Sequence, residues 1–177
     1  MKIQVFKTMT AVAMLALVSP AFAGSWTNPS GTADNFAYTN GGDLNGRFGD
    51  PFVFGDSFFF STTFSVNASN GAVDQQVDTV SFDALADSGL MFAGVTVSAI
   101  GSYAVTGAGS SVDLNGTVSM KENAGSGSLG RVFSETMNTS PAFPISSGNG
   151  TWDGGADVNV EFVFPSPHDD IHFELSN

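Results

Sequence analysis

The chain has 177 residues, with 17 Asp and Glu against five Lys and Arg, and it contains no cysteine. The absence of cysteine excludes disulfide bonds, thiolate metal sites and a cysteine nucleophile. A formal net charge of −12 argues against nucleic acid and anionic membrane surfaces as partners, because phosphate groups are bound by clustered Lys and Arg.

The N-terminal segment 1–23 is predicted to be a secretory signal peptide. Lys2 and Lys7 give a positive start, residues 11–18 are apolar, and Ala21-Phe22-Ala23 fits a cleavage site. The apolar stretch is shorter than the roughly 20 residues that span a bilayer. We therefore expect an exported domain over residues 24–177, without a transmembrane segment after cleavage. Its expected location is extracellular, on the cell surface or in the periplasm.

The first expected strand covers residues 34–39, and a polar loop follows it. Asp43, Asn45 and Asp50 in and after this loop offer the oxygen ligands that calcium prefers. Arg47 stands where a further ligand would be expected, and no Glu closes the segment. Calcium is therefore kept as an alternative, and no other cofactor is predicted.

A hairpin rich in phenylalanine, residues 48–66, is predicted to supply much of the core. From Phe58 to Val66 the even positions are mostly apolar and the odd positions mostly hydroxyl-bearing, which is the period of a half-buried strand. Gly55-Asp56 between two apolar runs suits a two-residue turn, since Gly tolerates the positive φ that such turns require.

Further strands are expected at the positions where apolar residues alternate. For the first, a start at Thr79 and a short helix over residues 82–87 are the alternatives. Gly101 is expected to form a bulge. The expected ranges are 76–84, 90–105, 112–122, 131–137, 157–165 and 171–175. Together they predict an all-β fold, a single antiparallel β-sandwich that is jelly-roll-like.

Two short blocks resemble the first and last motifs of the GDSL esterases: Gly55-Asp56-Ser57-Phe58 and Asp169-Asp170-Ile171-His172. The resemblance implies a Ser57 nucleophile with an acid and a base from the second block. However, the Gly-x-Asn-Asp element of the oxyanion hole is absent, and a strand pattern follows Ser57 where that fold needs a helix. We therefore predict no enzymatic activity and keep the esterase as a third alternative.

The C-terminal block also offers His168, Asp170 and His172 as metal ligands, with a solvated outer face of an edge strand as the alternative. Residues 153–157 are expected to form a turn. Trp26, Tyr38 and Trp152 are candidates for a platform that stacks against sugar rings.

Longer stretches resemble secreted bacterial proteins of the exosortase-sorted (PEP-CTERM) type. They are residues 40–51, Gly55 to Phe60, and residues 95–109 followed by an alternating strand. The resemblance implies an exported β-rich protein at the cell surface or in the extracellular matrix, although the sequence given ends at Ser176-Asn177 without the usual sorting tail. We expect a structural or adhesive matrix role, with polysaccharide or other surface proteins as partners. The alternative is a carbohydrate-binding module, with calcium as an optional aid.

Overall fold

The computed structural model describes residues 4–5, 9–15, 24–62, 64–67, 73–123, 130–160 and 169–177, with side chains from Trp26 onward. Throughout these ranges the chain forms strands, turns and loops, which confirms the predicted all-β class. The described part holds no helix with the length and apolar character needed to cross a membrane.

One sheet, here called sheet 1, contains six strands in the order β13-β14-β10-β2-β7-β6. Its strands are β13 (Asn138–Ser140), β14 (Gly148–Asn159), β10 (Gly94–Val105), β2 (Met9–Leu15), β7 (Ser57–Thr62) and β6 (Phe52–Phe54). The predicted turn at Gly55-Asp56 is confirmed: it joins β6 to β7, and Gly55 has a φ of 60°.

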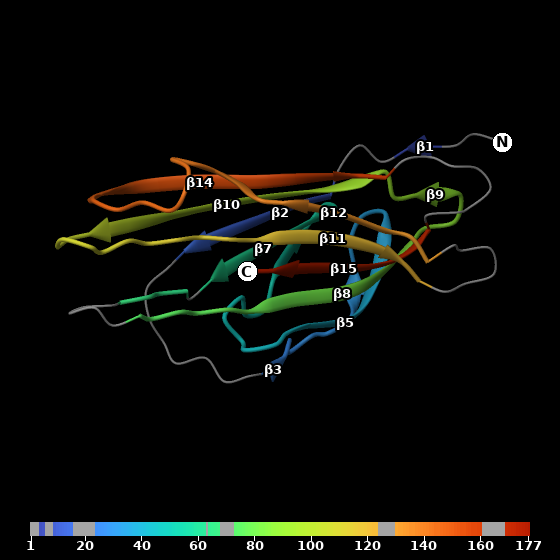
Figure 1. The fold of residues 1–177 in the computed structure, drawn as a ribbon. Coiled ribbons are helices and arrows are strands. Elements are labelled where there is room, and N and C mark those ends of the chain that lie inside the picture. The colour runs from blue at the N-terminus through green and yellow to red at the C-terminus, as the bar shows by residue number, and fades with distance from the viewer. Residues whose placement is uncertain are drawn as a thin grey trace.

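The other sheet, sheet 2, has the order β12-β11-β15-β8-β5-β3, and β4 also pairs with β5. Figure 1 shows β15 between β11 and β8. The strands are β12 (Val132–Thr136), β11 (Thr117–Glu122), β15 (Asp170–Ser176), β8 (Thr79–Ala86), β5 (Phe36–Asp43), β3 (Gly24–Ser25) and β4 (Gly31–Thr32). A separate parallel pair joins β1 (Gln4–Val5) to β9 (Leu90–Met91).

The core is an aromatic layer between the two sheets. Phe58 of β7 stacks on Phe82 of β8 with ring centroids 4.5 Å apart, and Phe82 stacks on Phe173 of β15 at 4.8 Å. All three rings are at most 1% exposed. Trp26 lies against Phe58 and Phe82 at 6.0 Å from each. This layer confirms a β-sandwich, whereas the jelly-roll topology remains a prediction.

Several predicted strands have the expected inward faces. Val80 and Phe82 in β8, and Ile171 and Phe173 in β15, are buried at alternate positions. The alternative helix over residues 82–87 is wrong, because β8 continues to Ala86. The strand through the phenylalanine-rich hairpin ends earlier than predicted, at Thr62. Beyond it, Val66 is 45% exposed instead of buried.

The predicted strand over residues 112–122 is wrong in its first half. β11 begins at Thr117, and Val112 makes only an isolated bridge to Ile145. The Asp113 carboxylate accepts the N–H of Leu114 at 2.9 Å and an Asn115 side-chain N–H at 3.3 Å. Such local bonds give the backbone an alternative to a strand ladder, so the apolar alternation there does not produce a strand.

Glycines explain two further corrections in the long β10–β14 pair. The register runs without a shift from Gly94 to Val105, so Gly101 is not a bulge. Residues 153–157 are not a turn, because they lie inside β14. A Cβ at Gly155 would lie 2.7 Å from the Val97 carbonyl oxygen, so this glycine permits close approach of two backbones.

Two pairings in sheet 1 depart from the predicted antiparallel arrangement. β2 runs parallel to both of its neighbours, with Ala11 in register with Phe58 of β7 and with Val97 of β10. Among the other described pairings only β1–β9 is parallel. β2 falls inside the predicted signal peptide, so the sheet contains a strand that cleavage would remove.

Candidate functional site

A cluster of phenylalanines lies on the outer face of sheet 1, at the end formed by β6. Phe52 and Phe54 are 67% and 71% exposed, and the Phe52 ring lies 6.3 Å from the half-buried ring of Phe59. We call Phe52, Phe54 and Phe59 the β6 edge. Exposed aromatic side chains at a sheet edge are unusual, since such edges are normally protected by charge or cover.

The β6 edge is held in place by the turn and by the strand behind it. Val53, in register with the buried Phe58, packs against the core and turns its two neighbours outward. The Asp56 carboxylate in the turn accepts hydrogen bonds from the backbone N–H of Asn35 at 3.0 Å and from its side-chain amide at 2.6 Å. These bonds fix the hairpin, so the exposed rings are presented on a defined backbone.

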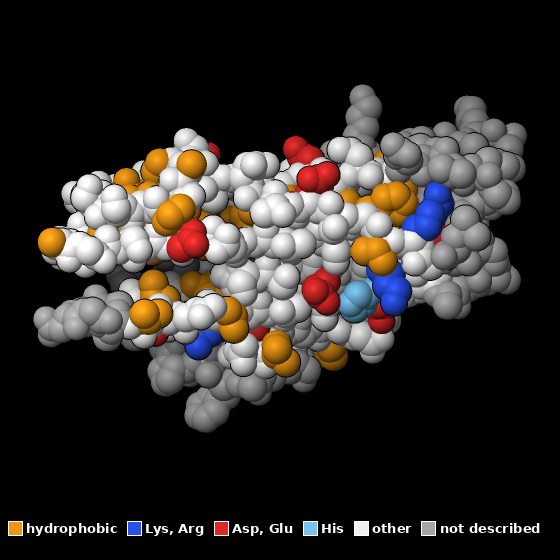
Figure 2. Space-filling model, in the orientation of Figure 1, with side chains coloured by type: hydrophobic (Ala, Val, Ile, Leu, Met, Phe, Trp, Pro, Cys, Tyr) orange, Lys and Arg blue, Asp and Glu red, His pale blue; other side chains and the backbone are white. Residues whose placement is uncertain are grey.

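A second aromatic group, Tyr103, Phe143 and Trp152, is here called the aromatic trio. It lies where the C-terminal end of β10 pairs with the N-terminal half of β14. Tyr103 and Trp152 both contact Phe143, edge to face, at 6.2 and 6.1 Å. All three are half-buried. Figure 2 shows hydrophobic side chains gathered at the end of the molecule where Figure 1 places the tips of these strands.

Two glycines in the β10–β14 pair leave space for rings of the aromatic trio. Trp152 is in register with Gly101, where a Cβ would lie 2.5 Å from the indole Nε1. Tyr103 is in register with Gly150, where a Cβ would lie 3.1 Å from the phenol oxygen. The rings therefore lie directly over the opposite backbone. The sequence identified Trp152, but Tyr103 and Phe143 could not be joined to it without the register.

The predicted sugar-stacking platform is corrected by this arrangement. Trp26 and Tyr38 are only 3% and 7% exposed, and their ring centroids lie 6.2 Å apart inside the core. They cannot present a face to a ligand. Of the three residues, Trp152 alone lies near the surface.

The predicted calcium ligands serve the polar loop that follows β5. Asp43 accepts the N–H groups of Phe48 at 2.8 Å and Gly49 at 3.1 Å. Asn45 donates to the Val77 carbonyl at 2.9 Å, and Asp50 accepts the N–H of Thr27 at 2.6 Å. The three side chains therefore point to different backbone partners.

A second acid supports the same loop from the start of β8. Asp78, 1% exposed, accepts the N–H groups of Asn45 and Arg47, both at 2.7 Å. Burial raises the pKa of the Asp43 carboxyl, the bonds from Gly49 and Phe48 oppose this, and the nearby Asp78 adds to the rise. The pair acts as a scaffold for the loop.

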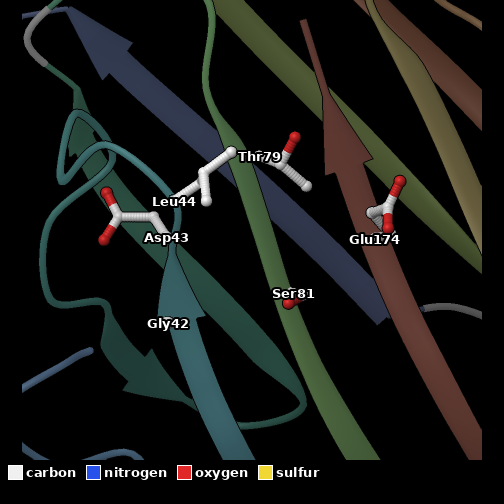
Figure 3. A pocket seen from close by; sticks show the side chains of 6 residues that line it. All are labelled: Gly42, Asp43, Leu44, Thr79, Ser81 and Glu174. Carbon is white, nitrogen blue, oxygen red and sulfur yellow. The ribbon is translucent and has the colours of Figure 1, made fainter. Parts of the chain in front are cut away.

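A shallow hollow beside this loop brings no ligand set together. It is lined by Gly42, Asp43, Leu44, Thr79, Ser81 and Glu174. Figure 3 shows the Asp43 and Glu174 carboxylates on opposite sides of β8, so they do not converge. Within the side chains that the structure describes, no three His, Cys, Asp or Glu are grouped so that they could hold a metal ion.

His172 and Asp170 lie in a polar network on the outer face of sheet 2, while His168 lies outside the described residues. The predicted edge strand is in fact interior, between β11 and β8. His172 Nδ1 lies 2.8 Å from Asp83 Oδ1, and Asn123 donates to Asp170 at 2.8 Å. The pale blue histidine in Figure 2 is next to acidic and basic side chains.

Asp83 is the centre of this network. Burial alone would raise its pKa, but hydrogen bonds from Asn40, His172 and Asn123, with the charge of His172, hold the pKa of Asp83 below its ordinary value. The carboxylate is thus kept charged and joins β5, β8 and β15 across the sheet. This is the arrangement of a structural polar cluster.

The residues of the esterase alternative are not brought together. Ser57 follows the turn of sheet 1, next to the buried Phe58, and faces outward there. His172, between the buried Ile171 and Phe173, faces outward from sheet 2. The two side chains therefore lie on opposite outer faces of the sandwich, where a serine and its base cannot share a proton.

The comparisons with known proteins found no matching family model, curated protein or solved structure.

Proposed function

We propose that the protein is an exported, non-enzymatic β-sandwich with a structural or adhesive role in an extracellular matrix, and that the β6 edge is its contact surface. The observation that carries the proposal is the exposure of Phe52 and Phe54, 67% and 71%, on a hairpin fixed by Asp56. The remote placement of Ser57 and His172 supports the non-enzymatic part. The resemblance to exosortase-sorted proteins supports the location.

The first prediction concerns adsorption to matrix. The double variant Phe52→Ser, Phe54→Ser should bind the insoluble extracellular matrix of the source cells more weakly than the parent chain. Each ring buried in such a contact contributes about 1.5 kcal/mol or more, and about 1.4 kcal/mol corresponds to tenfold in Kd. We expect the half-saturation concentration in an adsorption isotherm to rise by about tenfold per ring.

The matched control replaces two exposed apolar residues of sheet 2. Leu85 and Val132 are 54% and 60% exposed, so Leu85→Ser, Val132→Ser makes a comparable exchange of exposed apolar side chains for hydroxyl groups elsewhere. This variant should adsorb like the parent chain, and melting curves should show that both variants are folded. Equal adsorption by all three proteins, or equal losses in both variants, would refute the role of the β6 edge.

A carbohydrate-binding module is the second candidate, and the half-buried aromatic trio favours it. Since the chain has two Trp and Trp26 is buried, quenching of fluorescence by a bound sugar should report on Trp152. Screening against a glycan array should then find a ligand, with saturable quenching that Trp152→Phe removes. The titration is repeated with calcium and with a chelator. Absence of saturable binding under both conditions would eliminate this candidate.

A further inference from the structure

In sheet 1, β2 lies between β7 and β10, which do not pair with each other. The space that β2 fills is here called the slot. Residues 10–15 are in register with residues 57–62 of β7, and residues 9–14 with residues 95–100 of β10. β2 thus forms a ladder on each side. Cleavage of segment 1–23 would withdraw both ladders at once.

The vacated slot would be about two strand spacings wide, close to 10 Å. The facing edges of β7 and β10 would present unpaired N–H and C=O groups, which form a template for another strand. The inward residues Phe58 and Phe60, now 0% and 3% exposed, and Val97, 1% exposed, would lose the strand between them.

Each side of the slot is anchored elsewhere, which opposes simple closure. β10 is paired with β14 from Gly94 to Val105. β7 is held against sheet 2 by its core side chains, because Phe58 stacks at 4.5 Å on Phe82, which stacks in turn on Phe173. Moving β7 across the gap would pull Phe58 out of this stack, whereas filling the gap with a strand would keep it.

We propose that the slot between β7 and β10 is a strand-acceptor site that binds an extended peptide segment of a partner surface protein in parallel orientation. β2 indicates the chemistry of that segment: Met9–Leu15 has seven residues without charge, and Ala11 and Ala13 are in register with Phe58 and Phe60. Backbone hydrogen bonds then supply affinity, and small residues at alternate positions supply fit. The proposal rests on the proposed export.

The test uses the leader-free chain recovered from a secreting host, its N-terminus verified by mass. The probe is a synthetic peptide with the sequence of Met9–Leu15 and terminal lysines for solubility. We expect saturable binding, slower amide exchange in β7 and β10, and a rise in melting temperature. That rise should be about 5–10 °C at a hundred times the peptide Kd. The peptide carrying Ala13→Pro should not bind, because proline removes a ladder donor.

Three results would overturn the proposal. A retained leader would mean that the slot never opens. Amides of β7 and β10 that are already protected in the leader-free chain, whether by closure or by a second copy, would mean that the slot is occupied. Equal binding of the proline peptide would show a contact that does not use a ladder. The second and third results leave the adsorption expected from Phe52 and Phe54 unchanged, so in those cases the two proposals fail separately. A retained leader would also count against the proposed export.

Discussion

Deletion of residues 170–177 is expected to prevent stable folding of the domain. β15 is paired with β8 at seven positions and with β11 at six, so its loss divides sheet 2. Ile171, Phe173 and Leu175 are 2%, 0% and 4% exposed, and each buried side chain of this kind contributes about 1.5–3 kcal/mol. Their sum is comparable to the whole stability of a typical domain, about 5–15 kcal/mol.

The measurement is circular dichroism during heating together with sedimentation velocity. The truncated chain should show no cooperative transition and should aggregate through the exposed edges of β8 and β11. Glu174→Gln is the control, because it changes an outward position of the same strand and leaves the ladders intact. A truncated chain that stays monomeric and melts at the parent temperature would contradict the described sheet order.

Phe58→Ala is expected to be the most damaging single substitution in sheet 1, at about 3–5 kcal/mol. Phe58 is fully buried and contacts the rings of Trp26, Tyr38 and Phe82. Its neighbour Phe59 lies on the outer face of the same strand and is half-buried. Phe59→Ala therefore makes the same chemical change on the other face and should cost much less.

Urea unfolding of the two variants measures the difference. The midpoint should fall steeply for Phe58→Ala and slightly for Phe59→Ala, with similar slopes if both unfold in two states. Equal midpoints would show that the faces of β7 are wrongly assigned. They would also remove the physical reason for the exposure of Phe52, because Phe52 and Phe59 are in register.

Alternation predicted the strands best where nothing competes with the ladder. In β8 and β15 every second residue is apolar, and the aspartates inside these strands, Asp83 and Asp170, bond to residues far away in the chain, so the period of two gives the buried face directly. At Val112 the same period fails, because Asp113 binds the local backbone. The expectation that glycine-rich residues form a turn also fails at Gly155. There glycine allows two strand backbones to pack closely.

The candidate surfaces were less accessible to sequence reasoning, because they depend on register and on contacts between distant residues. Phe143 comes from the segment between β13 and β14, and only the β10–β14 register brings Tyr103 and Trp152 to it. Asp43, Asn45 and Asp50 have the composition of a cation site. Their actual partners are backbone N–H and C=O groups on several segments, which the sequence does not reveal.

The position of β15 also determines when the protein can fold. Its partners β8 and β11 both end by residue 122, but they do not pair with each other. They are joined only when residues 170–176 pair with both. Contacts this far apart in sequence form slowly, since a long loop must close first. A chain that emerges from its N-terminus onward therefore remains without a finished sheet 2 until β15 has been made. Under the proposed export, this late closure would keep the chain unfolded while it crosses a membrane.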